Sequence, residues 1–208
     1  MNFTPFYIAF LVISSGFRIF QNRAKQNREG GTVYFKPIFS LQFWLYVLML
    51  IFSLVEFFLV GRRMNLFISL SGLIFYLAGI IGREWVIKTL GRYWSVDIRI
   101  REDHKLIKEG PYGYVRHPNL VCLFLEANGL CLIPNSYYAL IFVWTIYLAS
   151  ILIRIHLEEK ALIEKLGQEY IDYKKEVFGL LPIRHGKLSS TRAPEHQSTS
   201  HQNPTSDG

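Results

Sequence analysis

The sequence predicts an all-α integral membrane protein with about five transmembrane helices. Half of its 208 residues are hydrophobic and only 19% are charged, whereas about 25% are charged in an ordinary soluble domain. The mean hydropathy is +0.20. This composition argues against a disordered protein and against a disulfide-rich secreted domain. Cys122 and Cys131 lie in one apolar run, so we expect buried thiols and neither a disulfide nor a metal pair.

Five apolar stretches approach the length of about 20 residues that a helix needs to cross the hydrocarbon core. Their approximate bounds are 3–17, 41–60, 66–81, 119–133 and 138–153. No small-residue cleavage site follows the first stretch, so we expect a retained span and not a signal peptide. In the third, Gly72 and Gly79 stand seven residues apart, and Ala78 and Gly82 stand four apart. Such spacings place small residues on helix faces that a neighbouring helix can approach closely.

The basic residues predict the orientation of these spans. The segments that follow the five spans carry 5, 2, 8, 0 and 8 Lys and Arg residues, so that alternate sides carry 21 and 2. By the positive-inside rule we expect the N-terminus outside and the C-terminus in the cytoplasm. The net charge of +7 then fits a cytoplasmic membrane face beside anionic lipid, and it requires no nucleic acid as a partner.

The chain divides into three regions. Residues 1–64 hold two spans and a basic cytoplasmic loop, and residues 65–184 hold three spans and an amphipathic helix. That helix covers about 156–178, and we expect it to continue the fifth span into the cytoplasm and then to lie along the interface. Residues 185–208 are a polar tail that we expect to be disordered because it lacks the aliphatic residues of a core.

Two charged motifs are predicted at the cytoplasmic interface. His117 and Pro118 open the fourth span, where free N–H groups and the helix dipole suit a carboxylate. Arg154, Glu158 and Glu159 stand where the fifth span leaves the membrane, and two adjacent carboxylates could hold a cationic group of a ligand. The structural alternatives are a basic loop that anchors the fourth span to headgroups and an i,i+4 ion pair at a helix exit.

Glu126 lies inside the fourth span. Because a carboxylate in lipid is costly, we expect it to face a cavity or a partner, either as a functional group or in a structural hydrogen-bonding role. The sequence contains no GxGxxG, HExxH or CxxC pattern, so it supports neither a soluble nucleotide-binding domain nor a metal site.

The motifs resemble those of the isoprenylcysteine carboxyl methyltransferase family over roughly residues 85–185. The matching pattern is His104-x-Leu106-Ile107-x-x-Gly110-x-Tyr112-x-x-Val115-Arg116-His117-Pro118, followed by Arg154-x-x-x-Glu158-Glu159. The resemblance implies a cytoplasmic S-adenosylmethionine site formed by the loop before the fourth span, the fourth and fifth spans and the amphipathic helix. The cofactor-binding residues that it implies are His104, Lys105, Leu106, Ile107, Tyr112, His117, Pro118, Asn119, Leu120, Glu158 and Glu159, with Asp97 as a further candidate. Where the family usually has Tyr and Gly, this chain has Leu120 and Cys122.

The resemblance implies a membrane-embedded O-methyltransferase that acts on a lipophilic small-molecule or prenylated acceptor, most directly the carboxylate of an isoprenylcysteine-like substrate. Arg154 would hold that anionic group. The segment Leu90-Gly91-Arg92-Tyr93-Trp94-Ser95, with Leu125-Glu126, also resembles a bacterial branch that methylates phenolic or enolic polyketide lipids such as alkylpyrones and alkylresorcinols. Such an acceptor must lose a proton, and Glu126 would be the catalytic base. The alternatives of other classes are an NADPH-dependent membrane reductase and a non-catalytic membrane scaffold.

Overall fold

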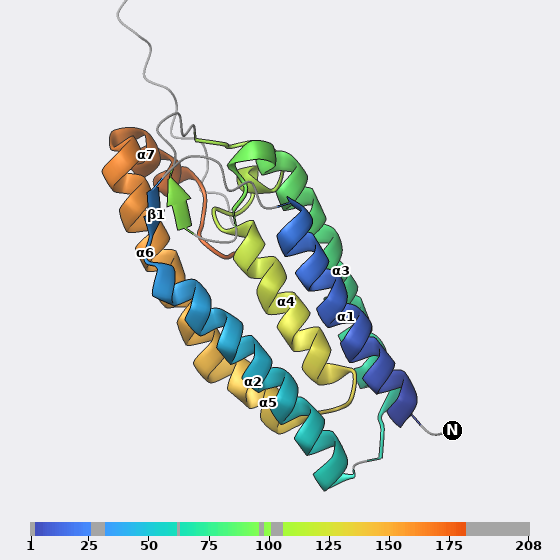
Figure 1. Cartoon of the computed structure of the whole chain (residues 1–208). Coiled ribbons are helices and arrows are strands. Elements are labelled where there is room, and N and C mark those ends of the chain that lie inside the picture. The colour runs from blue at the N-terminus through green and yellow to red at the C-terminus, as the bar shows by residue number, and fades with distance from the viewer. Residues whose placement is uncertain (1–2, 26–31, 62, 96–97, 101–105, 182–208) are drawn as a thin grey trace, which may run out of the picture.

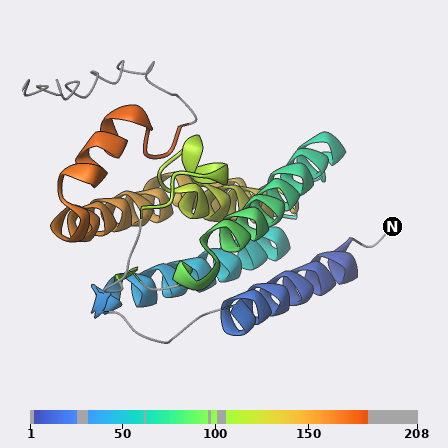
Figure 2. The ribbon, with the colours of Figure 1, turned by 90° about the horizontal axis from the view of Figure 1, so that it is seen from above.

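The computed structural model describes residues 3–25, 32–61, 63–95, 98–100 and 106–181. Its long helices run side by side as a bundle, and a short C-terminal helix folds over one end (Figure 1). The helices are α1 (Thr4–Lys25), α2 (Lys36–Val60), α3 (Leu66–Leu90), α4 (Pro118–Leu132), α5 (Tyr137–Phe142), α6 (Leu148–Leu166) and α7 (Gln168–Glu176), with 3-10 turns at Gly91–Tyr93 and Gly110–Gly113. Figure 2 shows α1 at the edge of this bundle.

Three helical segments in the described part of the chain are long and apolar enough to cross a membrane. They are Pro37–Val60, Leu66–Tyr93 and the continuous rod Tyr137–Leu166. The 22-residue α1 and the 15-residue α4 are not among these three, so the count of five spans stays a prediction. The first, third and fifth helices extend well past their predicted apolar stretches, because a helix continues into polar sequence that hydropathy alone does not mark.

The predicted small-residue face of α3 is the surface on which α4 packs. A Cβ atom added at Gly129 of α4 would lie 2.6 Å from both the carbonyl oxygen of Gly72 and the backbone nitrogen of Tyr76. One added at Gly79 would lie 2.7 Å from Cγ of Glu126. Such distances are too short for real contacts, so these glycines allow the two backbones to approach more closely than side chains would permit.

The rod formed by α5 and α6 contains one irregular turn and ends at a glycine. Residues Val143–Tyr147 form a π-helical turn between the two helices, and Tyr147 there is buried. Gly167 has φ +58°, a conformation that favours glycine and stops the helix, so α7 turns away from α6. The predicted amphipathic helix over 156–178 is therefore two helices, the end of α6 and α7.

Two short strands are an addition to the predicted all-α arrangement. Residues Thr32–Tyr34 (β1) pair with Ile98–Ile100 (β2) in antiparallel register, which joins the loop after α1 to the loop before α4. Both cysteines are buried and free, as predicted. The tail over 185–208 and the candidate cofactor residues Asp97, His104 and Lys105 lie outside the described residues.

Candidate functional site

The start of α4 is fixed by the C-terminal segment of the chain. His117 is the N-cap residue of α4, and its side chain is buried. Its backbone N–H donates to the carbonyl oxygen of Gly179 at 3.1 Å, and the N–H of Arg116 donates to that of Phe178 at 2.9 Å. The segment after α7 therefore reaches back to the first turn of α4, the position where the sequence predicts the cofactor site.

Glu159 is the centre of a buried ion cluster. Its carboxylate lies 2.8 Å from Nη2 of Arg116, 2.6 Å from Nζ of Lys174 and 3.3 Å from Nε2 of His117. Arg116 also donates through Nη1 to the carbonyl oxygens of Lys174 and Val177. These four residues, here called the Glu159 cluster, join α6, α7 and the start of α4. The geometry favours a positioning role for Glu159, whose carboxylate oxygens both have cationic partners.

The neighbouring Glu158 is placed differently. Its side chain is 32% exposed, against 9% for Glu159. Its nearest basic nitrogen atoms in the part of the chain that the structure describes are Nδ1 of His117 at 3.9 Å and Nε of Arg154 at 4.0 Å. The two adjacent carboxylates thus have different surroundings, and Glu158 is the one that a ligand cation can reach.

An aromatic cluster on α7 closes this end of the site. Tyr170 and Tyr173 are buried, and Leu106 packs against them. The hydroxyl of Tyr173 donates to the carbonyl oxygen of Tyr112 at 2.6 Å. Burial raises the pKa of both tyrosines well above its ordinary value, with the Glu159 and Glu158 carboxylates adding to the effect at Tyr170, so the hydroxyls stay protonated at neutral pH.

The remaining predicted cofactor residues have unequal exposure. Pro118 is buried in the first turn of α4, and Leu120 packs in the main hydrophobic core, so its side chain is used in packing. Ile107 is half-buried in the loop before the Gly110–Gly113 turn. The cofactor-binding roles proposed for these residues stay predictions.

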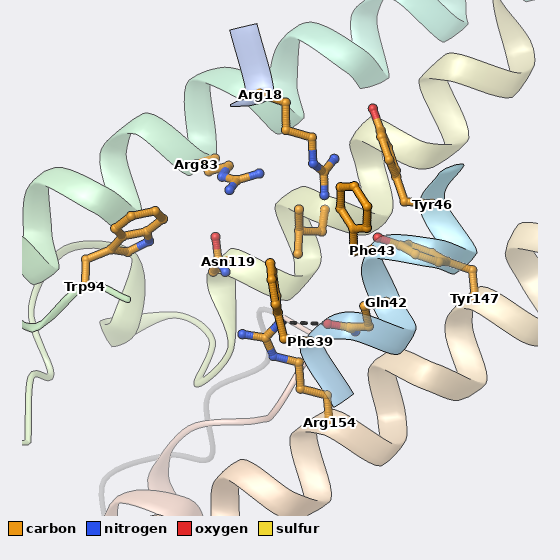
Figure 3. Close-up of a pocket in the computed structure, with 11 residues that line it drawn as sticks. Arg18, Phe39, Gln42, Phe43, Tyr46, Arg83, Trp94, Asn119, Tyr147 and Arg154 are labelled. Carbon is orange, nitrogen blue, oxygen red and sulfur yellow. Dashed lines mark hydrogen bonds between the residues drawn. The ribbon is translucent and has the colours of Figure 1, made fainter. Parts of the chain in front are cut away.

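Arg154 opens onto a cavity inside the helix bundle, here called the arginine cavity. The cavity has a volume of about 470 Å³ including its open mouth. Figure 3 shows Arg18 and Arg83 extending into it from α1 and α3, with Arg154 on the opposite side. Its lining residues are Arg18, Phe39, Gln42, Phe43, Tyr46, Arg83, Trp94, Asn119, Leu123, Tyr147 and Arg154. Nη1 of Arg154 donates to Oε1 of Gln42 at 2.7 Å, which links α6 to α2.

The predicted base Glu126 does not line this cavity. Its Oε2 lies 3.0 Å from Nη1 of Arg18, and its Oε1 lies 3.9 Å from Nη1 of Arg83. The guanidinium of Arg18 also stacks 4.0 Å from the ring centroid of Tyr46. Glu126 therefore faces a partner, as expected, and these contacts favour the structural alternative; its role as a base stays a prediction.

The structure brings two of the predicted site residues, Asn119 and Arg154, to this one cavity, whereas sequence reasoning missed much of its lining. Arg18 and Arg83 count in the sequence as basic residues outside the apolar stretches, although they lie within the longer helices α1 and α3. Gln42 and Trp94 carry no charge and belong to no catalytic pattern. The one available signal was the resemblance of the segment around Trp94 to a branch of a known family.

Similar proteins share this part of the chain. Residues 72–164 match the family model of isoprenylcysteine carboxyl methyltransferases. The chain is 28% identical to the uncharacterized protein YpbQ of Bacillus subtilis, over 69% of this chain and 85% of that protein. It is 31% identical to protein-S-isoprenylcysteine O-methyltransferase B of Arabidopsis thaliana, over 66% of this chain and 74% of that protein.

A solved structure gives the same fold. The eukaryotic intramembrane Ras methyltransferase ICMT superposes with a TM-score of 0.55 at 25% identity, over 74% of this chain and 55% of that one. The chain thus spans little more than half of that protein. The match confirms the predicted class of an all-α integral membrane protein. All predicted site residues fall within residues 72–164, whereas Arg18, Gln42 and α7 lie outside that range.

Proposed function

Since the chain belongs to the isoprenylcysteine carboxyl methyltransferase family, we propose that it is a methyltransferase that moves a methyl group from S-adenosylmethionine to an oxygen of a lipophilic acceptor. The observation that supports this proposal most directly is the position of Arg154 and Glu158, one helical turn apart on α6. Arg154 faces the arginine cavity, and Glu158 faces His117 at the start of α4. One face of α6 thus presents a site for an anion beside a site for a cation.

The residues at this end of α4 fit the cofactor. The half-exposed carboxylate of Glu158 can accept hydrogen bonds from an α-ammonium group. Oδ1 of Asn119 is buried and has no hydrogen-bond partner among the described residues, so it offers a further acceptor. S-adenosylmethionine supplies an electrophilic methyl group when it is bound. The Glu159 cluster holds α6, α7 and α4 in the positions that this binding requires.

Methyl transfer to an oxygen is an in-line displacement, so the protein contributes alignment and charge placement. Arg154 can hold a two-oxygen anion through the planar fork of its guanidinium. Its hydrogen bond to Gln42 fixes the side chain toward the cavity. We propose the carboxylate of an isoprenylcysteine-like compound as the acceptor, because a carboxylate is already ionised at neutral pH and needs no base.

We also propose that this end of the molecule faces the cytoplasm. Arg116, Lys174 and Lys175 belong to the cytoplasmic side predicted from the charge distribution, and two of them take part in the Glu159 cluster. A tag placed after Gly208 should then be labelled only in opened cells. Labelling of that tag from outside intact cells would reverse the orientation.

The function is tested with the full chain purified in detergent or nanodiscs. We expect saturable binding of radiolabelled S-adenosylmethionine and transfer of the label to an S-prenylated cysteine derivative. Glu158→Ala should reduce binding, whereas Glu164→Ala, which changes an exposed carboxylate on the same helix, should not. Failure of the wild-type protein to bind the cofactor would overturn the proposal. Labelling of an alkylated hydroxypyrone but not of the prenylcysteine would replace the proposed acceptor.

A further inference from the structure

The polar lining of the arginine cavity is rich in hydrogen-bond donors. Guanidinium groups of Arg18, Arg83 and Arg154 reach it from three different helices, and none of the lining residues in the described part of the chain is Asp or Glu. Arg83 and Arg154 are nine-tenths or more buried, so their charges lie in a low-dielectric interior. Glu126, which lies outside the lining, pairs with Arg18 at 3.0 Å and lies 3.9 Å from Arg83. One carboxylate beside two of the three guanidinium groups still leaves a positive charge around the cavity, which favours an anion in it.

Two uncharged donors in the same cavity have no hydrogen-bond partner among the described residues. They are Nε1 of Trp94, whose side chain is 1% exposed, and Nε2 of Gln42, which is 5% exposed. The other end of the Gln42 amide accepts from Arg154, which fixes its NH2 group in place. An unsatisfied buried donor is costly, so two of them in one cavity indicate a ligand with acceptor atoms. The unpartnered acceptor in the same lining, Oδ1 of Asn119, is the one proposed above for the cofactor.

We propose that the arginine cavity holds the reacting group of the acceptor as a two-oxygen anion, with Arg83, Trp94 and Gln42 contacting it opposite Arg154, and that Arg83 and Trp94 determine acceptor specificity. This inference rests on the proposed function. A carboxylate or an enolate conjugated to a carbonyl has only acceptor atoms and therefore matches this lining. A neutral hydroxyl group or an ester matches it poorly, because fewer of the donors are satisfied. The aromatic and aliphatic lining residues Phe39, Phe43 and Leu123 suit the apolar part of the same molecule.

The test compares binding of an ionised acceptor with binding of its methyl ester, a neutral molecule of nearly the same shape. The probe is an N-acetylated S-prenylcysteine, used as the free acid and as its methyl ester. The affinity for each form is measured for the wild-type protein, Arg83→Met and Trp94→Phe. We expect the wild type to bind the acid at least about tenfold more tightly than the ester. Arg83→Met, which leaves Arg154 in place, should lower this ratio severalfold, and Trp94→Phe should lower it by a smaller factor. Lys88→Met, on the exposed face of the same helix, is the matched control and should leave the ratio unchanged.

Cofactor affinity separates this inference from the proposed function. If Arg83→Met and Trp94→Phe bind S-adenosylmethionine normally and keep the wild-type ratio, the inference is overturned and the proposed function stands. Loss of cofactor binding in the wild type would overturn the function itself. If Arg83→Met does not fold, the ratio measured for Trp94→Phe decides alone. If a short-chain phosphatidate displaced the bound acid as effectively as unlabelled acid does, the cavity would be assigned to a lipid headgroup and the inference would be overturned.

Discussion

The Glu159 cluster and the arginine cavity differ in how they combine carboxylates with basic side chains. In the cluster, one carboxylate lies within 3.3 Å of three basic side chains. In the cavity, three guanidinium groups surround a space whose described lining contains no carboxylate. The first arrangement is complete within the chain and joins its helices. In the second, Glu126 lies outside the lining and is one carboxylate beside two guanidinium groups, Arg18 at 3.0 Å and Arg83 at 3.9 Å, so the cavity stays complementary to an anion from outside. Substitutions in both regions test this division.

Removal of the Glu159 carboxylate should have the largest effect on stability. Glu159→Ala leaves Arg116, Lys174 and His117 without their shared partner, and loss of one member of a buried ion pair costs about 3–5 kcal/mol. Equilibrium unfolding in mixed micelles should show this decrease in the free energy of unfolding. The exposed Glu164→Ala should stay within about 0.5 kcal/mol of the wild type. A decrease for Glu159→Ala no larger than that of the control would show that the cluster does not join the helices.

Arg154→Lys should affect the reaction more than the fold. Lysine keeps the positive charge but loses the planar fork and the geometry of the bond to Gln42. We expect kcat/KM for the acceptor to fall about 100-fold, which corresponds to about 2.7 kcal/mol, while the affinity for S-adenosylmethionine changes little. Steady-state kinetics with both substrates varied provide the measurement. Equal turnover by the two proteins would remove Arg154 from the acceptor site.

Glu158→Ala should weaken cofactor binding without the loss of stability that is expected for Glu159→Ala. We expect the affinity for S-adenosylmethionine to fall at least about tenfold, or about 1.4 kcal/mol, with a free energy of unfolding close to that of the wild type. His117→Ala should weaken binding by a similar factor. Equilibrium binding of the radiolabelled cofactor measures both variants. If Glu158→Ala destabilised the protein as strongly as Glu159→Ala, the contrast between the two residues would be wrong.

Lys174→Met should have the smallest effect, although its ammonium group lies 2.6 Å from Glu159. The Lys174 side chain is 44% exposed, and solvent screening limits such a contact to about 1 kcal/mol or less. Arg116→Met should cost more, because Arg116 is 10% exposed and also donates to two backbone carbonyls. The same unfolding measurement ranks the two variants. The reverse order would mean that α7 depends on Lys174 more than on the buried arginine.

Patterns local in sequence predicted the helices and part of the site. Glycine spacing predicted the α3 face that receives α4, and an i,i+4 spacing placed Arg154 beside Glu158. Adjacent residues on a helix differ by about 100° in direction, so Glu158 and Glu159 had to face different surroundings. Which of them is enclosed depends on Arg116, 43 positions earlier in the chain, and such distant contacts leave no periodic signal.

Contacts between distant helices also explain what was missed at the cavity. Arg18 and Arg83 contribute to the charge count that predicts orientation, and that count carries no information about where a side chain points. Their contact with Glu126 spans 108 positions for Arg18, and it becomes visible only when α1, α3 and α4 are packed together. The strand pair depends likewise on the folded chain. The break at Gly167 is different, because a glycine that ends a helix is a local signal, and the prediction of one helix over 156–178 did not use it.

The π-helical turn at Val143–Tyr147 determines the register between the two halves of this helix. A π turn equals one residue inserted into an α-helix, and it shifts the faces on its two sides by about 100° relative to each other. Deletion of Thr145 would restore a regular helix and rotate Arg154 out of register with the preceding α5 segment. Relatives that lack the turn should therefore align with a one-residue gap at this point, and the gap would mark where the register of the two halves of this helix differs between family members.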